Sequence, residues 1–522
     1  MSAHDRLALG TRSMNAALVV SALVSACAAQ DVRVVNLIPP ALSAERYHNG
    51  EPHLAVNPRN NQQIAVSASW THDTFCSDDA VSVLFASNDE GVTWNAVCEL
   101  SHTAASWPRD LTLAFSGDGT NLFAGYLVKL PPPPATPTAP WLWHAYFAAT
   151  NNFLAPVPMT VLHTRANVDQ PYLQAPTQDL QRALVIGVND ATMTGGTGST
   201  ACNSGAVYMI ADALVPSTLA PFCISQRFTM GATPAVRTAS HASGLTYAVF
   251  YRPLSPDPLR KDVIVVRRST FTPGPFADLK DLPALPTLDP CTSRDGQIGY
   301  RVARCRPVPL GPDGDPWFGQ ERRVSSNLSI AVSPVSATTV YVAWADSIDD
   351  NHQTLHVRKS INAGATWSTD LITVPNATNP ALAVDQDGTV GFLYQQVSGE
   401  LLYSRWETRL ELSDDDFRTR KSFELANTPA LAPPYAWPTA AYAPYIGDYV
   451  HLTAVNRTFY GVFSASNDVA KVVFPYGATF QRTVVAGQLQ DGLGGVVEPS
   501  LDPYFFSVKK PGPPTLYATP PE

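Results

Sequence analysis

A strand-turn-strand unit recurs along this chain, and it limits the possible folds more than any other feature. Each unit has a polar residue, often with proline, then a short apolar strand, a turn and a second apolar strand. The seven units begin at Gly50, Arg109, Asp169, Ala232, Ser326, Asn379 and Gly447. They lie about 50–70 residues apart, except around a long insertion at 271–325. Because four-stranded repeats of this period are typical of β-propellers, the sequence predicts an all-β propeller over 31–508, with seven blades favoured over six.

Two octapeptides follow the third strand of their units. SNDEGVTW occupies 87–94, and SINAGATW occupies 360–367. The shared positions are Ser87, Asp89, Gly91, Thr93 and Trp94 in the first copy and Ser360, Asn362, Gly364, Thr366 and Trp367 in the second. In such a turn the Asp or Asn side chain accepts hydrogen bonds from the turn's own backbone N–H groups, and glycine supplies the positive φ. The tryptophan is expected to pack between sheet layers. Turn chemistry explains the pattern without any reactive group.

Composition limits the classes of function. The chain has 522 residues, of which 45% are hydrophobic and 15% are charged, with 46 prolines. Low charge and high proline content suit a rigid, loop-rich β protein better than a helical one. The formal net charge of −9 argues against non-specific binding to nucleic acid or anionic membranes. The sequence has no Gly-x-Ser-x-Gly, His-Glu-x-x-His or phosphate-loop motif, which removes the commonest hydrolase and nucleotide-binding hypotheses.

The first 30 residues have the pattern of an export signal. Arg6 and Arg12 precede an apolar segment at 16–24, which is too short to span a bilayer as a stable anchor. The residues at 24–27 also resemble the lipid-attachment box of bacterial lipoproteins, in which Cys27 would be acylated; simple cleavage after residue 28 is the alternative. The mature chain is therefore expected to be secreted or held at the cell surface, without a transmembrane segment.

The remaining cysteines also favour export. They are Cys76, Cys98, Cys202, Cys223, Cys291 and Cys305, which form three sequential couples. Six cysteines allow many connectivities. Because each couple brackets an apparent hairpin or loop, we expect the two members of each couple to be bonded to each other. Three local disulfides imply an oxidising compartment.

The first octapeptide matches the Asp box, Ser-x-Asp-x-Gly-x-Thr-Trp, at every fixed position, and the second matches it with Asn in place of Asp. The chain therefore resembles the Asp-box (BNR-repeat) proteins, whose best-known members are the sialidases, over about residues 45–508. Two segments near the end, PYIGDYVHLTAVNRTFYGVFSASND and PSLDPYFFSV, are similar to secreted bacterial sialidase-like proteins without an assigned reaction. The resemblance implies an exo-sialidase-like glycoside hydrolase that acts on extracellular glycans.

Sialidases as a family have six blades, bind the substrate carboxylate with three arginines, and use a Tyr–Glu pair as nucleophile and an Asp as acid/base. The Arg-Ile-Pro motif of the first arginine is absent here, and Arg46 is the arginine available in that region. Asp78 and Asp79 precede the first octapeptide and are the implied acid/base candidates, with a solvated loop as the alternative. Tyr445 and Tyr449 precede the last inner strand and are the implied nucleophile candidates, with aromatic packing as the alternative. Candidates for the other two arginines are Arg109, Arg165, Arg252 and Arg322.

A second pattern does not depend on the family. Residues just before the inner strands should converge around the propeller axis on one face. They are Glu51, Arg109, Asp110, Asp169, Asn379 and Asp448, with His53, Tyr172, Tyr449 and His451 close by. Carboxylates, arginine, histidine and aromatics together suit a pocket for a polar ligand. The alternative is that these residues cap exposed strand ends and line a water-filled channel.

The remaining expectations concern partners and ions. No cofactor is expected, although acidic loops containing Asp313, Asp315, Asp346, Asp349 and Asp350 could hold Ca²⁺; solvated loops are the alternative. The Pro-rich tail at 509–522 is expected to be disordered and the protein to be a monomer. The alternative to a hydrolase is a non-catalytic propeller that binds glycan or protein at the cell surface. A purely structural surface lipoprotein is the third hypothesis.

Overall fold

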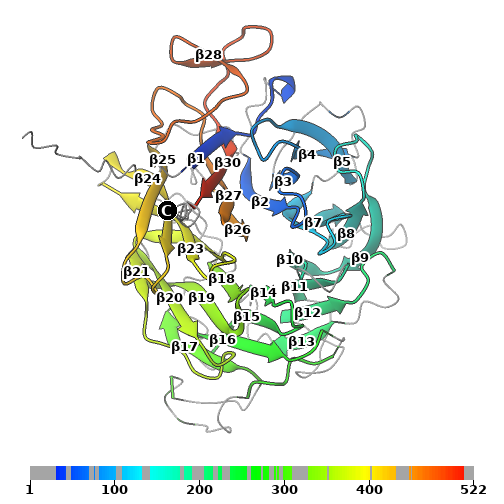
Figure 1. Ribbon diagram of the computed structural model, residues 1–522, viewed down its shortest axis with the longest axis vertical. Helices are drawn as coiled ribbons and strands as arrows, with labels where there is room; N and C mark the ends of the chain where they lie inside the picture. The colour runs from blue at the N-terminus through cyan, green and yellow to red at the C-terminus, as the bar shows by residue number, and fades with distance from the viewer. Residues whose placement is uncertain are drawn as a thin grey trace, which may run out of the picture. The chain divides into compact units, whose positions relative to one another are not determined.

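The computed structural model describes residues 31–42, 49–69, 76, 81–101, 108–131, 142–176, 182–190, 205–215, 221–225, 235–254, 260–271, 274–280, 287, 289, 291–292, 298–307, 327–349, 352–399, 403–430, 446–447 and 449–510. All of them lie in one unit, residues 31–510. They form seven four-stranded antiparallel sheets and one two-stranded ribbon, and their one helical element is the 3-10 turn η1 (Pro40–Leu42). The seven-bladed propeller predicted from the repeats is confirmed, and the six-bladed alternative is wrong (Figure 1).

Each sheet is one blade, and its strands are given from the innermost to the outermost. Blade 1 contains β2 (Gly50–Val56), β3 (Ile64–Ser69), β4 (Val81–Ser87) and β5 (Asn95–Ser101). Blade 2 contains β6 (Arg109–Phe115), β7 (Leu122–Leu130), β8 (Leu142–Thr150) and β9 (Thr160–Ala166). Blade 3 contains β10 (Val168–Gln174), β11 (Leu184–Asp190), β12 (Gly205–Ile210) and β13 (Phe222–Ser225).

The other four blades follow the same plan. Blade 4 contains β14 (Arg237–Ser240), β15 (Thr246–Pro253), β16 (Arg260–Arg268) and β17 (Tyr300–Pro307). Blade 5 contains β18 (Leu328–Ser333), β19 (Ser336–Asp349), β20 (His352–Ser360) and β21 (Ile372–Pro375). Blade 6 contains β22 (Ala377–Val384), β23 (Val390–Ser398), β24 (Arg405–Ser413) and β25 (Lys421–Pro429). Blade 7 contains β26 (His451–Val455), β27 (Thr458–Ser466), β30 (Leu501–Lys509) and β1 (Asp31–Asn36).

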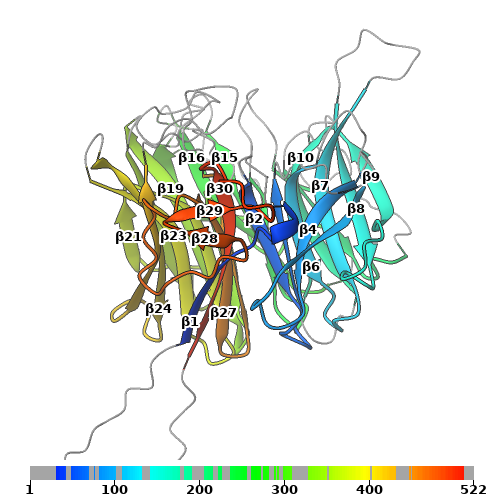
Figure 2. The same cartoon turned by 90° about the horizontal axis from the view of Figure 1, so that it is seen from above.

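The middle strands of the blades are buried on both faces. Every residue of β15 and of β27 is buried, and both strands are rich in the aromatic and β-branched residues that pack well in sheets. The hydrophobic clusters lie between neighbouring blades: Tyr251 and Val265 of blade 4, for example, share one cluster with Trp344 of blade 5. Sheet-on-sheet packing of this kind stabilises a ring of blades, because each blade covers the apolar faces of its two neighbours. Figure 2 shows the strands running along the axis of that ring.

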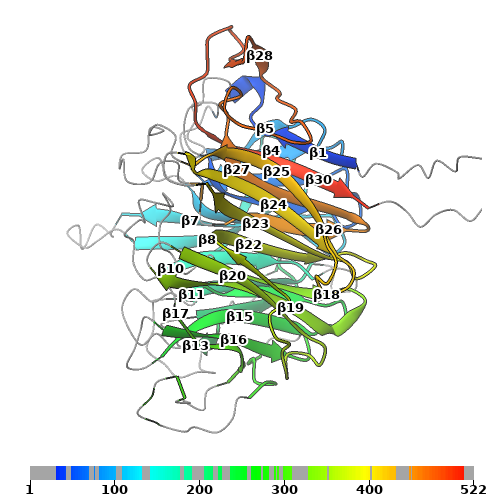
Figure 3. The same cartoon turned by 90° about the vertical axis from the view of Figure 1, so that its left-hand side faces the viewer.

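The two ends of the described chain close the ring in blade 7. Strand β1 pairs antiparallel with β30 in continuous register from Asp31–Lys509 to Asn36–Tyr504. The N-terminal strand is therefore the outermost strand of the last blade, so that backbone hydrogen bonds join the first and last parts of the fold. The ribbon of β28 (Thr483–Val485) and β29 (Gln488–Gln490) lies between β27 and β30 in the chain and stands outside the ring (Figure 3).

The inner strands β2, β6, β10, β14, β18, β22 and β26 surround the axis, and each contacts the inner strand of the next blade. Four of them begin with a bulge in which one residue has a positive φ. These residues are Glu51 (φ 53°), Asp110 (φ 47°), Gln170 (φ 48°) and Asn379 (φ 56°), and the register with the second strand shifts at each of them. Because a bulge re-aims the side chains that follow it, the repeat sets a common geometry at the axis.

Both octapeptides form tight turns between the third and fourth strands of their blades, as predicted. Asp89 accepts hydrogen bonds from the Val92 and Thr93 N–H groups at 3.0 and 2.9 Å and from the Thr93 hydroxyl at 2.6 Å. Asn362 accepts from the Thr366 N–H at 2.9 Å. The indole Nε1 of each tryptophan donates to the carbonyl of the turn glycine, at 3.1 Å in blade 1 and 3.2 Å in blade 5. The two turns therefore share the same backbone scheme, but one side-chain bond is reversed: the Thr93 hydroxyl donates to Asp89, whereas Asn362 Nδ2 donates to the Thr366 hydroxyl at 2.8 Å.

A third turn of this kind lies at 413–420 in blade 6, although its sequence, SDDDFRTR, lacks the glycine and the tryptophan of the two octapeptides. The N–H of Phe417 donates to the Ser413 hydroxyl at 2.8 Å, and Asp415 accepts from the Thr419 N–H at 2.9 Å and from its hydroxyl at 2.8 Å. Phe417 holds a φ of 62° where the other two turns have glycine, and Arg420 stands where they have tryptophan. The hydrogen-bonding scheme thus persists although two of the recognisable residues are lost.

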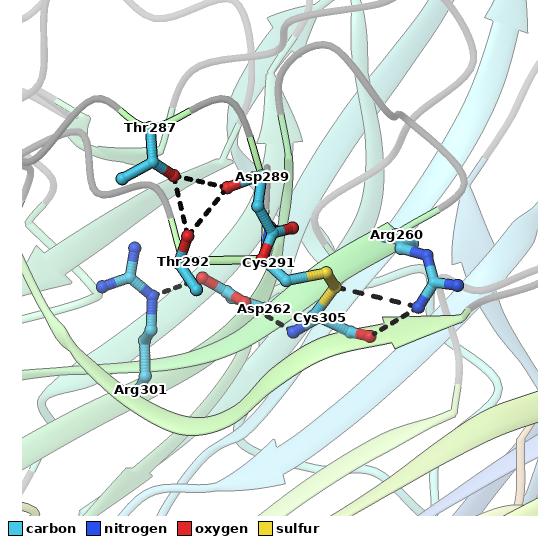
Figure 4. Close-up of a disulfide and its surroundings, with 8 residues drawn as sticks. All are labelled: Arg260, Asp262, Thr287, Asp289, Cys291, Thr292, Arg301 and Cys305. Atoms are coloured by element: carbon cyan, nitrogen blue, oxygen red, sulfur yellow. Dashed lines mark hydrogen bonds and ion pairs between the residues drawn. A yellow bond between two sulfur atoms is a disulfide. The ribbon is translucent and has the colours of Figure 1, made fainter.

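Disulfides lie at the predicted couples wherever both cysteines are described. Cys76 bonds to Cys98, and Cys291 bonds to Cys305. Cys223 is disulfide-bonded too, but Cys202 lies outside the described residues, so that pairing stays a prediction. Figure 4 shows how the strand carrying Cys305 is held: the Cys305 N–H donates to Asp262 at 2.8 Å. In the described part of the chain, no helix is long and apolar enough to cross a membrane.

Candidate functional site

The bulges place one residue of each inner strand at the same level of the axis. In each inner strand we consider the residue two positions after the positive-φ residue of the bulge, or after the equivalent residue of the repeat. Together these seven residues form what we call the axial layer. The axial layer consists of His53, Thr112, Tyr172, Arg237, Ser329, Ala381 and His451. Side chains of this layer accept hydrogen bonds from the next blade: Leu113 N–H donates to His53 Nδ1 at 3.1 Å, and Leu382 N–H donates to the Ser329 hydroxyl at 2.9 Å. These hydrogen bonds therefore join neighbouring blades around the axis.

Four members of the layer form a compact group, which we call the axial cluster: His53, Tyr172, Arg237 and His451. The two imidazoles are stacked with their centroids 3.7 Å apart, and Tyr172 meets His53 edge to face at 5.7 Å. The Arg237 guanidinium lies 4.8 Å from the centroid of the Tyr172 ring, within cation–π distance. His53 is only 1% exposed and Arg237 only 5% exposed. The cluster thus combines a buried cation with two imidazoles and a phenol.

Burial keeps both imidazoles of the axial cluster neutral. The pKa of His53 lies well below its ordinary value, because of burial first and then the nearby His451 and Arg237. Burial, together with Arg237, lowers the pKa of His451 to about 3. Burial raises the pKa of Tyr172, and the nearby Arg237 opposes that shift. At neutral pH, Arg237 is therefore the charged member of a cluster whose other groups are neutral.

The backbone hydrogen bond to His53 also determines its tautomer. Because Nδ1 accepts from Leu113 N–H, the proton of the neutral ring must be on Nε2. Nε2 is buried and has no hydrogen-bond partner among the described residues, and the same holds for Nδ1 of His451. Buried polar atoms are normally satisfied, so unpaired ring nitrogens at one point of the axis indicate a position for water or for a ligand.

Two cavities adjoin the axial cluster. The first has a volume of about 20 Å³, which is enough for about one water molecule, and is lined by all four members of the cluster together with Tyr449. The second, which we call the axial channel, has a volume of about 460 Å³ and is lined by residues from all seven inner strands. Tyr172 and His451 belong to its wall as well, so the channel reaches the cluster. At the turns that follow the inner strands, polar residues line the channel: Arg59, His241, Gln386 and Asn456.

Several of the predicted ring residues lie at the starts of the inner strands. Glu51 and Asp110 are buried and occupy equivalent bulge positions in blades 1 and 2. Asn379 occupies that position in blade 6, and its Nδ2 donates to Gln395 at 2.9 Å and to the Gly447 carbonyl at 3.0 Å. Asp169 lies opposite Asn189 in the register of β10 and β11. Their convergence on one ligand site stays a prediction, and nothing in the geometry assigns them a role.

The predicted arginines have individual partners. Arg109 lies over the Trp143 ring at 5.2 Å, and Arg165 forms a 2.8 Å ion pair with Asp190. Arg252 is buried and donates to the Ile298 carbonyl at 2.7 Å. The other predicted site residues, which are Arg46, Asp78, Asp79, Arg322, Tyr445 and Asp448, as well as Cys27, lie outside the described residues.

Arg237 was not predicted as a site residue, although its position in the repeat is a signal for it. Arg237 is the third residue of AVRTA, just as His53 is the third residue of EPHLA. Lining up the seven repeats on the bulge would have brought both residues to the axis.

Of the acidic residues considered for Ca²⁺, Asp346 is the one whose side-chain contacts the structure gives. Asp346 pairs with Arg306 and lies 3.1 Å from His356 Nε2, and the Nδ1 of His356 lies 2.9 Å from Asp370. These groups form a charged network between blades 4 and 5. Asp313, Asp315 and Asp350 lie outside the described residues. Among the residues that the structure does describe, no three His, Cys, Asp or Glu side chains come together as a metal site would require.

Fold and axis together define a seven-bladed β-propeller with a polar cluster at the inner end of an axial channel. No known family and no curated protein matches the chain. Among solved structures, it is similar to the GH74 enzyme of Niastella koreensis (10% identity, 82% of this chain and 70% of that chain, TM-score 0.35). It is also similar to the α-L-arabinofuranosidase Arb93A of Fusarium graminearum (10%, 70% and 93%, TM-score 0.41) and to the polysaccharide lyase Uly1 (9%, 85% and 88%, TM-score 0.39). At these identities the likeness concerns the fold alone.

Proposed function

We propose that the protein is an exported, carbohydrate-active propeller enzyme that binds an acidic sugar at the axis. The observation that carries the proposal is the hydrogen-bonding character of the axial cluster. Arg237 can only donate, and His53 presents an Nε2–H donor because its Nδ1 is engaged by the backbone. A site whose cation and free donor converge favours a ligand rich in acceptors and negative charge, such as the carboxylate of a sugar acid.

The other groups of the cluster add neutral hydrogen-bonding capacity. At pH 7 the imidazole of His451 is neutral, because its pKa is lowered to about 3, and the Tyr172 hydroxyl is neutral, because its pKa is raised, so both can form hydrogen bonds to a ligand without carrying charge. The finer proposal is an exo-sialidase-like hydrolase, because a terminal sialic acid presents the carboxylate that Arg237 suits. Export is proposed from the N-terminal signal pattern and agrees with the disulfides.

Turnover of acidic and neutral glycans tests this proposal. The purified chain is incubated with a fluorogenic sialoside, a uronate-containing polysaccharide and a neutral glycan, and product formation is measured. We expect turnover of an acidic substrate, and we expect Arg237→Met to reduce kcat/KM for it by about 100-fold, the order found when one preorganised donor is removed. Arg182→Met is the matched control, because Arg182 forms a half-exposed ion pair with Asp212 away from the axis.

Thermal unfolding of both variants separates a folding defect from a binding defect. If no acidic glycan is turned over, or if Arg237→Met acts like Arg182→Met, the proposal is wrong.

The size of the inner cavity supports a second candidate, a non-catalytic glycan- or protein-binding propeller. About 20 Å³ beside the imidazoles cannot hold a sugar ring, so a ligand would contact the cluster only through the axial channel. Saturable binding of an acidic glycan without turnover, weakened by Arg237→Met, would favour this candidate over the enzyme.

A further inference from the structure

A groove of about 570 Å³ lies between the octapeptide turn of blade 5 and the equivalent turn of blade 6, and none of its lining residues belongs to the axial layer. We call it the seam groove. Its lining includes Lys359, Ile361, Trp367, Asp370, Asp416 and Arg418. A volume of this size falls within the range of small-ligand sites.

The groove has a rigid apolar part. Trp367 packs partly against the cluster between blades 4 and 5, and its Nε1 donates to the Gly364 carbonyl at 3.2 Å, so the orientation of the ring is determined. The rest of the indole lines the groove together with Ile361, whose side chain is 70% exposed. An exposed isoleucine beside an oriented indole forms an apolar surface that a sugar's C–H face can cover.

The polar part of the groove is held in place and balanced in charge. Lys359 Nζ donates to both carboxylate oxygens of Asp416, at 2.8 and 3.0 Å, and Arg358 Nε donates to Asp370 at 2.6 Å. The charged side chains that line the groove are two cations, Lys359 and Arg418, and two carboxylates, Asp370 and Asp416. Such a lining offers donors and acceptors for hydroxyl groups without favouring an anion or a cation. In this it differs from the axial cluster, which is dominated by donors.

We infer that the seam groove is a second saccharide-binding site, which takes a segment of a neutral oligosaccharide. The inference goes beyond the proposed function, because it requires neither catalysis nor a ligand at the axis. Neutral sugars present an apolar face and a rim of hydroxyls, and the groove offers an aromatic–aliphatic surface flanked by paired charges. Such a site would hold a glycan chain at the side of the ring while the axis engages an acidic residue.

Isothermal titration with neutral hexasaccharides built from glucose, xylose, arabinose or mannose tests the inference. We expect saturable binding of at least one hexasaccharide by the purified chain. Ile361→Arg, which places a long charged side chain across the groove, should raise the Kd of that hexasaccharide at least about tenfold. Trp367→Ala should do the same. The control is Asn88→Arg, because Asn88 is the exposed residue at the same turn position in blade 1.

Each outcome has a definite meaning. Because Ile361 is largely exposed, Ile361→Arg should fold normally even if Trp367→Ala does not. Absence of saturable binding by all four hexasaccharides would overturn the inference, and so would binding that Ile361→Arg leaves unchanged. Arg237→Met should leave hexasaccharide binding intact, so failure of the axial proposal remains distinguishable from failure of this one.

Discussion

The turns of blades 1 and 5 share most of their local hydrogen bonds but have different surroundings. In blade 1, Trp94 is 2% exposed, and the centroid of its ring lies 5.1 Å from that of Phe505. The backbone N–H of Trp94 donates to the Gln481 side chain at 2.9 Å. In blade 5, Trp367 is only partly buried and lines an open groove. The two related octapeptide turns therefore differ in coverage. The contact between blades is covered at the blade 1 turn, which we call the covered seam, and exposed at the blade 5 turn, which we call the open seam.

The difference arises from the closure of the ring in blade 7. Strand β30 supplies Phe505, and the segment between β27 and β30 supplies Gln481, so both partners of Trp94 come from the end of the chain. Another residue of the turn, Glu90, is contacted by the same blade: the Tyr460 hydroxyl of β27 donates to its carboxylate at 2.9 Å. The turn of blade 5 is contacted from blade 4: Arg267 donates to the Ala363 carbonyl at 2.9 Å, and Leu279 lies beside Gly364. Trp367 nevertheless stays partly exposed and lines the groove toward blade 6. A local motif therefore determines the shape of a turn but not whether the turn is covered.

Replacing the two tryptophans should give the largest difference between the turns. Trp94→Ala should lower the free energy of unfolding by about 3–5 kcal/mol, because it leaves a cavity among fully buried side chains. Trp367→Ala should cost about 1–3 kcal/mol, since part of the ring already contacts water. Denaturant unfolding followed by tryptophan fluorescence and circular dichroism measures both effects. Equal losses in the two variants would contradict the contrast between a covered and an open seam.

Replacing the two turn glycines should give a smaller difference. Both hold a positive φ, so alanine should cost about 1–2 kcal/mol of backbone strain at either position. At Gly91 an added Cβ would also lie 2.3 Å from the Phe505 ring, whereas at Gly364 its nearest neighbour is a Leu279 methyl at 3.0 Å. Gly91→Ala should therefore lower the melting temperature more than Gly364→Ala, as calorimetry of the two variants can measure. A larger loss at Gly364 would show that the blade 1 seam can adapt.

The acidic residue of the turn should give the smallest effect, visible as a pH dependence. Burial by itself raises the pKa of Asp89, but hydrogen bonds from Thr93, Ser87 and Val92 lower it overall. A carboxyl whose pKa is lower in the folded state stabilises the fold above its unfolded pKa, and this stabilisation disappears as pH falls through the folded pKa. Asn362 has no such titration.

Melting temperatures between pH 7 and pH 3 test this difference. Asp89→Asn should reduce the loss of stability in acid, and Asn362→Asp should increase it. Identical acid profiles for the parent and both variants would show that Asp89 contributes nothing to the pH dependence.

The sequence predicted most of the fold because the information is local and repeated. Alternating apolar residues, Asp-Gly turns and the seven units gave the number of blades, and the octapeptides gave two of the turns. It missed the turn at 413–420, because Phe417 and Arg420 replace the glycine and tryptophan by which such turns are recognised. It also missed the pairing of β1 with β30, since no local signal specifies which strands far apart in the chain will pair.

The candidate site could be predicted only in part. Among the residues predicted around the inner strands, His53 lines the inner cavity, whereas Glu51 and Asp110 occupy bulge positions at the start of β2 and β6. Arg237 was missed because the residues around it carry no recognisable motif. Its place in the axial cluster is defined by the cation–π contact of its guanidinium with the Tyr172 ring. The stacking of His53 on His451 joins the first blade to the last, and only ring closure brings those two strands together.

By itself the sequence determined the β class, the seven-fold repeat, the octapeptide turns and the disulfide couples that are described, because each depends on residues near one another in the chain. The tertiary structure alone decided the protonation of the axial imidazoles, the axial channel, and the contrast between the covered and open seams. These properties depend on burial and on contacts between blades. Both arise only when seven separate sheets close into one ring.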